Sequence, residues 1–386
     1  MSNNDYFPGQ DKGDKQTGSY PDIMPNPDVT WETSEQLDLG LDARFFDHRL
    51  SFTFDWYHKK TKDWLVQAPV LASYGTAAPY INGGDVVNKG VELSLGWRDN
   101  INDFNYSALI NLSHNKNEVT RIANTEKIIH SGVRLGNVAS EFARAEEGYP
   151  IGYFYGYQTD GLFQTPEDVQ NYKNSEEVVI MPNAVPGDVR FVDRNDDGII
   201  DDKDKTMIGK SNPDYNLGIN LNMSYKGFDL TLVASGVFGN DILRAYRMPD
   251  SPSQNYTSEI LGRWTGPGTS NSIPRISSGN HINRSYISDL YLEDGSYVRM
   301  SNVTLGYDFK KLWKSLPFEQ VRFYISAQNL FTITGYSGMD PEIGTSTGEN
   351  WISGVDFGFY PTPRTFMVGA SIKSVSYTPL TLPTIR

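Results

Sequence analysis

A twelve-residue acidic stretch is the segment of this chain whose residue types and spacing are best suited to chemistry. It reads DRNDDGIIDDKD from Asp193 to Asp204, with oxygen donors at its positions 1, 3, 5, 9 and 12 and glycine at position 6. That spacing is typical of an EF-hand loop, which surrounds calcium with about six to eight oxygen atoms. The expected ligands are the side chains of Asp193, Asn195, Asp197, Asp201 and Asp204 and the backbone carbonyl of Ile199.

Two features distinguish this segment from the loop of a calcium sensor. Its position 12 is Asp204 instead of the usual bidentate glutamate, so that ligand arm is shorter by one methylene. The flanking sequence also lacks the amphipathic helices of an EF-hand. We therefore expect calcium in a structural role, fixing the shape of the loop. The alternative is an acidic loop that faces water and holds no ion.

Aromatic side chains in the long irregular segments form a second group of candidates. Aromatic faces beside Asp and Asn are a common means of binding sugar rings or peptide side chains. The candidate substrate-binding residues are Tyr153, Tyr155, Tyr157, Trp264, Tyr336 and Trp351. The alternative for each of them is packing within a loop or in a girdle at a membrane interface.

Catalytic and nucleic-acid-binding patterns are absent from the sequence. It contains no HExxH pair, no GxSxG or GxGxxG motif and no complete Walker motif, and its five histidines are scattered. The absence of cysteine excludes disulfides and Cys-based metal sites. A net charge of −13 without any basic stripe argues against nucleic acid. We therefore expect neither an enzyme nor a nucleic-acid-binding protein.

The elements that must position these residues are β-strands, recognised by alternation of apolar and polar side chains. From Leu50 onward, for example, Leu50, Phe52, Phe54 and Trp56 share one face, and polar residues intervene. The nine expected strands cover residues 34–45, 50–63, 87–98, 105–117, 216–225, 228–238, 297–309, 321–330 and 364–373. A helix is expected near residues 141–147.

The connections between these strands alternate strictly between short and long. Such alternation is typical of an antiparallel β-barrel in an outer membrane, with small turns on one side and long extracellular loops on the other. The abundance of Tyr (23), Phe (19) and Gly (35) suits curved strands with aromatic girdles. A mean hydropathy of −0.47 does not oppose a barrel, because only every second strand residue meets lipid. No apolar run reaches the length of a transmembrane helix.

The odd number of strands indicates an incomplete barrel. Single-chain bacterial barrels have even strand numbers, and lipid does not tolerate the free edges of an open sheet. The first residues, MSNNDYFPGQDKGDK, also lack the apolar core of a signal peptide. We therefore expect this chain to be part of a longer protein whose true N-terminus precedes it, with residues 1–33 as the end of an extracellular loop.

Several motifs resemble the SusC/RagA family of TonB-linked outer-membrane transporters. The resemblance rests on KKTKDWL (59–65), GGDVVNKGVELSLG (83–96), GDVRF…NDDGIIDDKD…IGKSNPD (187–214), YLEDGSYVRMSNVTLGYDF (291–309), AQNLFTITGYSGMDP (327–341) and PTPRTFMVGASIK (361–373). It extends over about residues 25–373. It implies the C-terminal part of a 22-stranded barrel, and it implies calcium at the acidic loop as well.

The same resemblance implies partners. A family member works with TonB through an N-terminal plug, which this sequence lacks, and with a SusD-like surface lipoprotein that captures glycans or peptides. The expected location is the outer membrane of a Gram-negative bacterium. Residues 374–386, which include Pro379 and Pro383, depart from the family's usual terminal aromatic strand and are interpreted as an extraneous tail. The alternative function is a secreted, calcium-stabilised β-protein that binds polysaccharide.

Overall fold

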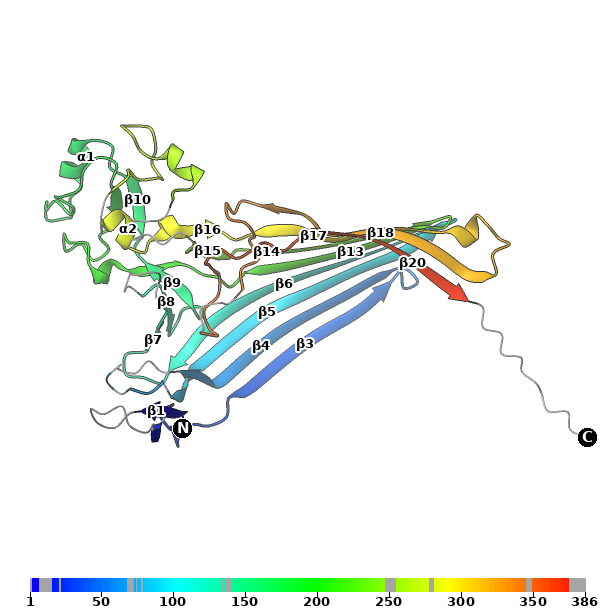
Figure 1. Cartoon of the computed structure of the whole chain (residues 1–386), viewed down its shortest axis with the longest axis horizontal. Helices are drawn as coiled ribbons and strands as arrows, with labels where there is room; N and C mark the ends of the chain where they lie inside the picture. Colours follow the sequence, from blue (N-terminus) through cyan, green and yellow to red (C-terminus); the bar gives the residue numbers. More distant parts are fainter. Residues whose placement is uncertain are drawn as a thin grey trace, which may run out of the picture.

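The structure is a computed structural model in which a long sheet carries a body of loops at one end (Figure 1). It describes residues 2–6, 16–20, 22–67, 73, 75–77, 79–133, 135, 141–246, 255–277, 281–344 and 349–374. The tail interpreted at 374–386 lies outside these residues except for Ser374, which pairs with Phe318 at the end of the last strand. Parts of the segment 1–33 also lie outside them.

Nine long strands form one antiparallel sheet, as predicted. They are β3 (Thr33–Phe45), β4 (Leu50–Gln67), β5 (Tyr80–Ile101), β6 (Phe104–Ile122), β13 (Tyr215–Tyr225), β14 (Phe228–Phe238), β17 (Tyr297–Asp308), β18 (Phe318–Thr334) and β20 (Thr365–Ser374). Each strand pairs with the next long strand along the chain, in the order β20-β18-β17-β14-β13-β6-β5-β4-β3. The sheet is a meander typical of a β-barrel wall and is open, with β3 and β20 at its edges.

The ends of the sheet differ, and this confirms the predicted alternation of connections. The short turns, including residues 46–49, 102–103 and 226–227, lie together at one end, and the long loops gather at the other (Figure 1). Lys226 and Gly227 both have positive φ, at 46° and 96°. A turn with two residues of positive φ matches the right-handed twist of the strands that it joins. Two residues are therefore enough to connect β13 and β14.

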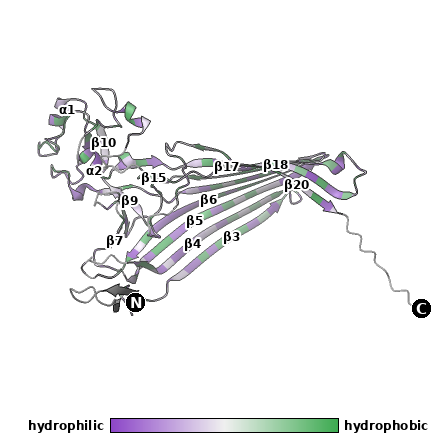
Figure 2. Cartoon of the chain, viewed as in Figure 1, coloured by the Kyte–Doolittle hydropathy of each residue, from purple (hydrophilic) through white to green (hydrophobic). Residues whose placement is uncertain are grey.

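The register of the sheet aligns apolar side chains from strand to strand on one face. Leu93 lies opposite Leu112, and Leu112 lies opposite Leu217 on the next strand. In the described part of the chain no layer covers this face: Leu39 is 60% exposed and Val368 is 84% exposed. Hydrophobic and hydrophilic residues alternate along the strands, as Figure 2 shows. The fold is therefore that of a transmembrane β-barrel wall, with its apolar face directed outward.

The opposite face carries polar side chains that pair across strands. Arg322 binds Asp229 through two hydrogen bonds, from Nε at 2.8 Å and from Nη2 at 2.5 Å. Thr53 donates to Asp42 at 2.6 Å. These pairs satisfy charges and hydroxyls that a barrel would enclose in its lumen.

Several strands extend beyond the predicted bounds at the loop end. There β5 begins at Tyr80 instead of residue 87, and β6 continues to Ile122 instead of residue 117. The consecutive residues Val86 and Val87 are both buried. Both faces of the sheet are covered in this region, and the alternation on which the prediction relied therefore disappears.

The long loops contain short elements of their own. They are β7 (Ile128–His130), β8 (Ala143–Glu146), β9 (Tyr153–Gly156), β10 (Thr159–Leu162), α1 (Pro166–Asn171), β11 (Val189–Phe191), η2 (Asp202–Asp204), β12 (Thr206–Gly209), β15 (Asp241–Arg244), η3 (Ser258–Gly262), α2 (Ile282–Ser285), η4 (Asp289–Tyr291), β16 (Leu292–Asp294) and β19 (Val355–Asp356). Near the start of the chain β1 (Ser2–Tyr6) pairs with β2 (Gln16–Tyr20), and η5 (Phe309–Lys311) lies in a turn. No helix in the described part of the chain is both long and apolar enough to cross a membrane.

The helix predicted near residues 141–147 is wrong, because this segment contains strand β8. Ala143 and Ala145 are both 0% exposed, whereas Arg144 and Glu146 between and after them are half-buried. That two-residue period fits a strand between β7 and β9, with which β8 pairs. The free energy gained by burying Ala143 and Ala145 in the sheet outweighs the intrinsic helix propensity of alanine.

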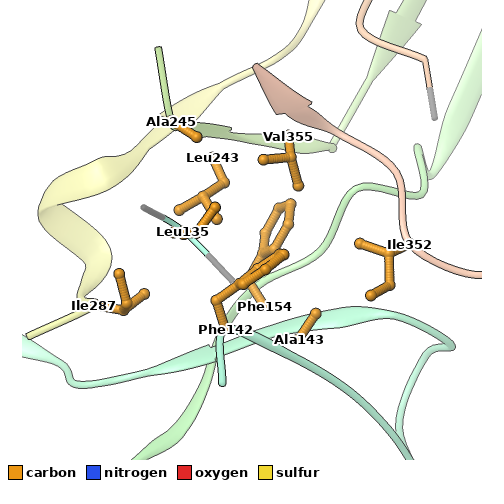
Figure 3. Packing of buried hydrophobic residues seen from close by; sticks show 9 residues of the cluster. All are labelled: Leu135, Phe142, Ala143, Phe154, Leu243, Ala245, Ile287, Ile352 and Val355. Carbon is orange, nitrogen blue, oxygen red and sulfur yellow. The ribbon is translucent and has the colours of Figure 1, made fainter. Parts of the chain in front are cut away.

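The loop body is held by buried apolar clusters. One joins Phe142 and Phe154 to residues from two other long loops, namely Leu243 and Ile352 (Figure 3). A second lies around Phe163 and packs η4, α1 and β11 together. A third covers the loop ends of β4, β5 and β6 and contains the buried residues Val66, Val86, Val119, Ile122, Ile129 and Ala145. The loops thus form a packed structure of their own above the sheet.

Candidate functional site

The predicted calcium loop has the internal hydrogen bonds of a compact turn. Gly198, with φ at +82°, donates its backbone N–H to Asp193 Oδ2 at 2.8 Å. Asn195 Oδ1 accepts from the backbone of Asp197 at 3.2 Å, and Asp197 Oδ1 accepts from the backbone of Ile199 at 3.0 Å. These bonds hold the segment in a compact turn.

Other contacts in the loop bear on whether its residues fit calcium. Asp193 Oδ1 is buried without a hydrogen-bond partner, so one carboxylate oxygen remains available to an ion. Asp204 is 0% exposed, and its two oxygens accept from the backbone of Arg194 and Asp201, each at 2.8 Å. The ammonium of Lys203 lies 3.4 Å from Asp197. The donor types suit calcium, but the backbone N–H groups of Arg194 and Asp201 occupy the Asp204 oxygens, and the Lys203 ammonium competes for Asp197.

Within the described ranges, no three acidic, histidine or cysteine side chains gather closely enough to hold a metal ion. The pKa of Asp197 lies below its usual range, chiefly because the Asn195 amide donates to its carboxylate. Asp197 therefore presents an ionised carboxylate at neutral pH. Calcium binding at Asp193, Asn195, Asp197, Ile199, Asp201 and Asp204 stays a prediction.

Three of the six candidate substrate-binding aromatics lie in or beside β9 and are buried. Tyr153 donates its hydroxyl to Glu146 Oε2 at 2.5 Å. Tyr155 stacks beneath the Arg144 guanidinium, whose carbon lies 3.5 Å from the ring centre. Tyr157 lies parallel to Tyr286, with ring centres 4.5 Å apart. Burial raises the pKa of Tyr153 and Tyr157 well above the usual range, so both hydroxyls remain protonated donors.

The other three aromatics lie in different parts of the loop body. Trp264 packs where Gly187 has no side chain and donates to Gln164 Oε1 at 3.1 Å. Tyr336 is 6% exposed and donates to Asp356 at 2.5 Å. Trp351 packs edge-on against Trp64 at 6.3 Å.

These six aromatics are therefore not gathered in one site. Each stabilises the loop body where it lies, and contact with cargo stays a prediction for all of them.

Buried ion pairs attach the loops to the sheet and to one another. Arg299, 4% exposed on β17, binds Asp340 and, at 2.5 Å, Glu342 in the loop that follows β18. Asp188, 1% exposed, accepts from Arg275 Nε at 2.7 Å and from Asn283 Nδ2 at 2.8 Å in another long loop. These contacts fix loops that are far apart in sequence above the same end of the sheet.

A cavity of about 440 Å³, which no sequence pattern indicates, lies in the loop between β14 and β17. Apolar side chains such as Ile260 and Ile273 line it, together with Arg244, Glu259 and Glu293. Arg244 lies 2.9 Å from each of the two glutamates. An apolar cavity with a few charged groups is a common form of ligand site. Its walls come from segments without regular periodicity, so no local pattern reveals them.

Comparison with known proteins agrees with this architecture. The model of the family described as TonB dependent receptor-like, beta-barrel matches residues 2–238, which is more than half of the chain. TonB-dependent receptors are outer-membrane β-barrel proteins of Gram-negative bacteria. The match includes six of the nine long strands and the acidic loop.

Individual relatives are also TonB-dependent receptors. TonB-dependent receptor P3 of Formosa agariphila is 33% identical over 359 residues, which cover 90% of this chain and 35% of that protein. TonB-dependent receptor SusC of Bacteroides thetaiotaomicron is 29% identical over 358 residues, which cover 90% of this chain and 32% of that protein. The chain thus spans about a third of the length of these relatives.

A solved structure has the same fold. The RagAB peptide transporter matches with a TM-score of 0.73 and 24% identity, over 96% of this chain and 38% of the other. The relatives are named as receptors and transporters, not as enzymes. The resemblance to the SusC/RagA family is confirmed, and the chain belongs to the TonB-dependent receptors, as part of their β-barrel.

Proposed function

We propose that this chain is the C-terminal barrel segment of a SusC-like importer in the outer membrane of a Gram-negative bacterium. The complete protein takes up glycans or peptides with a SusD-like lipoprotein, and TonB supplies the energy through an N-terminal plug. The observation that carries the proposal is the nine-stranded meander with one exposed apolar face and all its long loops at one end. Such a sheet buries its apolar face in lipid and presents its loops to the outside.

The packed loop body supports a role in capture. Phe142, Phe154, Leu243 and Ile352 come from three different long loops and share one buried cluster. Rigid loops above a barrel can hold a fixed surface for a lid protein and for cargo at low cost in conformational entropy. The cavity beside Arg244 lies in this body and is the candidate contact for a charged or amphipathic cargo group.

The alternative, a secreted polysaccharide-binding β-protein, has less support. In a soluble sandwich the apolar faces of two sheets pack against each other. Here Leu39, Phe366 and Val368 are all more than half exposed, and no second sheet covers them in the described part of the chain.

Genetic complementation tests the proposed function. The gene for the complete protein is deleted in its host, and growth is measured on oligosaccharide mixtures and on peptide mixtures as carbon sources. We expect growth on one class to fail and to return when the complete gene is restored, but not when its TonB-interacting region is removed. Unchanged growth and uptake on both classes would contradict an import role.

We also propose that calcium occupies the acidic loop as a structural ion. The support is the donor spacing, the positive φ of Gly198 and the unpartnered oxygen of Asp193. Thermal unfolding of the detergent-solubilised complete protein tests this with and without a calcium chelator. We expect calcium to raise the Tm of the wild type and to have no effect on an Asp193→Asn, Asp197→Asn variant. Equal calcium responses of the two proteins would contradict the proposal.

A further inference from the structure

The turn between β17 and β18 is the longest connection at the turn end of the sheet. It spans residues 309–317, whereas the neighbouring β13–β14 turn has two residues. The turn is compact, because Trp313 donates its backbone N–H to Phe309 at 2.8 Å and Lys310 Nζ donates to the carbonyl oxygens of Lys314 and Leu316. It is therefore an ordered surface.

An aromatic series connects this turn to the apolar face of the sheet. Phe309 stacks on Trp313 at 5.5 Å and lies edge-on to Phe323 at 5.5 Å. Phe323 belongs to the exposed apolar face and is 48% exposed. Trp313 and Leu312 are 55% and 59% exposed. Trp313 therefore continues the lipid-facing surface at the level where aromatic side chains meet headgroups.

Exposed lysines lie on this turn and on the neighbouring one. The side chain of Lys311 lies against Gly227, where an added Cβ would be 3.1 Å from its Cγ, so the β13–β14 turn and the β17–β18 turn touch. Lys226 in that neighbouring turn is exposed and lies over the ring of Tyr225. Lys314 is exposed on the long turn. Among the described residues, none of these three lysines forms an ion pair with a carboxylate within 4 Å.

We propose that Lys226, Lys311, Lys314 and Trp313 form a binding surface for the headgroup of an anionic phospholipid in the inner leaflet of the outer membrane. The indole and Leu312 enter the acyl boundary, and the three ammonium groups meet the lipid phosphate. Each lysine near a membrane surface is attracted to anionic headgroups, and the attractions of a cluster add, so the surface favours anionic over neutral lipids. This inference rests on the proposed outer-membrane location, since it requires the short turns to face the periplasm.

Acidic groups near the cluster do not cancel its charge. Asp308 accepts the backbone N–H groups of Lys310 and Val321, and Glu319 is paired with Lys373 at 3.2 Å. Asp103 precedes Phe104, which pairs with Tyr225, and therefore lies in the turn beside Lys226. With Lys310, four lysines stand against the two aspartates Asp103 and Asp308, which leaves a positive surface on a chain whose net charge is −13. That local reversal of charge favours an anionic partner.

Native mass spectrometry of the complete detergent-solubilised receptor tests the proposal with two probes, phosphatidylglycerol and phosphatidylcholine. We expect the wild type to bind phosphatidylglycerol at least fivefold more tightly. A triple Lys226→Gln, Lys311→Gln, Lys314→Gln variant should lose this preference to within twofold, and the corresponding triple arginine variant should keep it. Heat-modifiable electrophoretic mobility verifies that each variant is folded.

A matched control removes three lysines at the loop end, Lys116→Gln, Lys127→Gln and Lys173→Gln, and should leave the preference intact. Equal loss in the control and the turn variant would overturn the proposal, as would a wild type without preference. Displacement of phosphatidylglycerol by millimolar inorganic phosphate would also overturn it, by indicating a site for a free anion. Binding in detergent requires neither cargo nor lid protein, so a failure of the import proposal would be seen separately, in the growth assay.

Discussion

The sheet and the loop body of this chain place the same apolar residue types in opposite environments. Phe142, Phe163 and Phe191 in the loops are 0% exposed, whereas Phe228 and Phe366 on the sheet are 53% and 72% exposed. A soluble protein buries such side chains throughout, apart from scattered exceptions. The difference indicates that the loop body is surrounded by water and the apolar face of the sheet by lipid.

This comparison shows how the two regions obtain their order. Backbone hydrogen bonds along nine strands stabilise the sheet. Its side chains need only alternate between apolar and polar along each strand. The loop body has few long strands and depends on specific packing and on buried polar links such as Arg299 with Asp340. Mutations in the two regions should therefore have different effects, and matched pairs of substitutions test that difference.

The largest effect is expected from Phe163→Ala in the loop body. Removing a fully buried phenylalanine costs about 3–5 kcal/mol through lost transfer energy and a cavity. Hydrogen exchange should accelerate in the segments that pack around Phe163, with the sheet unchanged. The same substitution at Phe366, which creates no cavity, should leave exchange in the loop body as it is. Equal effects of the two substitutions would remove the distinction between the regions.

A charge on the apolar face should have the next largest effect. Ile219→Lys places an ammonium group in lipid near the middle of β13, at a cost of about 2–4 kcal/mol. Asn220→Lys, one residue along on the polar face, should cost much less. Urea unfolding of the complete receptor in lipid vesicles measures both. A larger loss for Asn220→Lys would show that the faces are assigned the wrong way round.

Loss of the Arg299 pair should loosen one loop without disturbing the barrel. Arg299→Ala leaves the Asp340 carboxylate buried without its partner, at a cost of about 1–3 kcal/mol. Limited proteolysis should then cut the loop between β18 and β20 sooner, while heat-modifiable mobility stays normal. The exposed pair of Lys62 and Glu35 provides the control, because Lys62→Ala should change neither measurement. Unaltered proteolysis of Arg299→Ala would argue against this pair as the attachment of the loop.

The smallest effect concerns Asp241 on β15. Burial raises the pKa of its carboxyl group, so its ionisation at neutral pH opposes the folded loop. Stability from the protonated form is present at low pH and is lost as pH rises through the folded-state pKa. Asp241→Asn should therefore slow local hydrogen exchange near β15 less than tenfold at pH 7 and not at all below about pH 4. The opposite pH dependence would contradict burial as the dominant influence.

The sheet could be predicted from sequence because its order is local. Residues such as Leu217, Ile219 and Leu221 alternate with polar neighbours, and that pattern alone identifies the strand and its lipid face. The prediction missed the loop ends of β5 and β6 because burial on both sides removes the alternation there. The parity of short and long connections correctly placed all long loops at one end.

The loop body could not be predicted in the same way. Its clusters join Phe154, Leu243 and Ile352 from three loops, and no spacing in the sequence records those contacts. The aromatic residues Tyr153 and Tyr157 stood out by type, and the structure places them in buried packing positions. The acidic loop was recognisable because its hydrogen bonds are local, from Asp193 to Gly198 and from Asn195 to Asp197.

The central claim is that the apolar face of the nine strands contacts lipid. The most direct test is a cysteine scan of residues 216–224 on β13, in a cysteine-free complete receptor, with a spin label at each position in lipid vesicles. We predict high accessibility to oxygen at Leu217, Ile219, Leu221 and Met223, and low accessibility at the residues between them. An absence of alternation, or alternation in the opposite phase, would contradict the account.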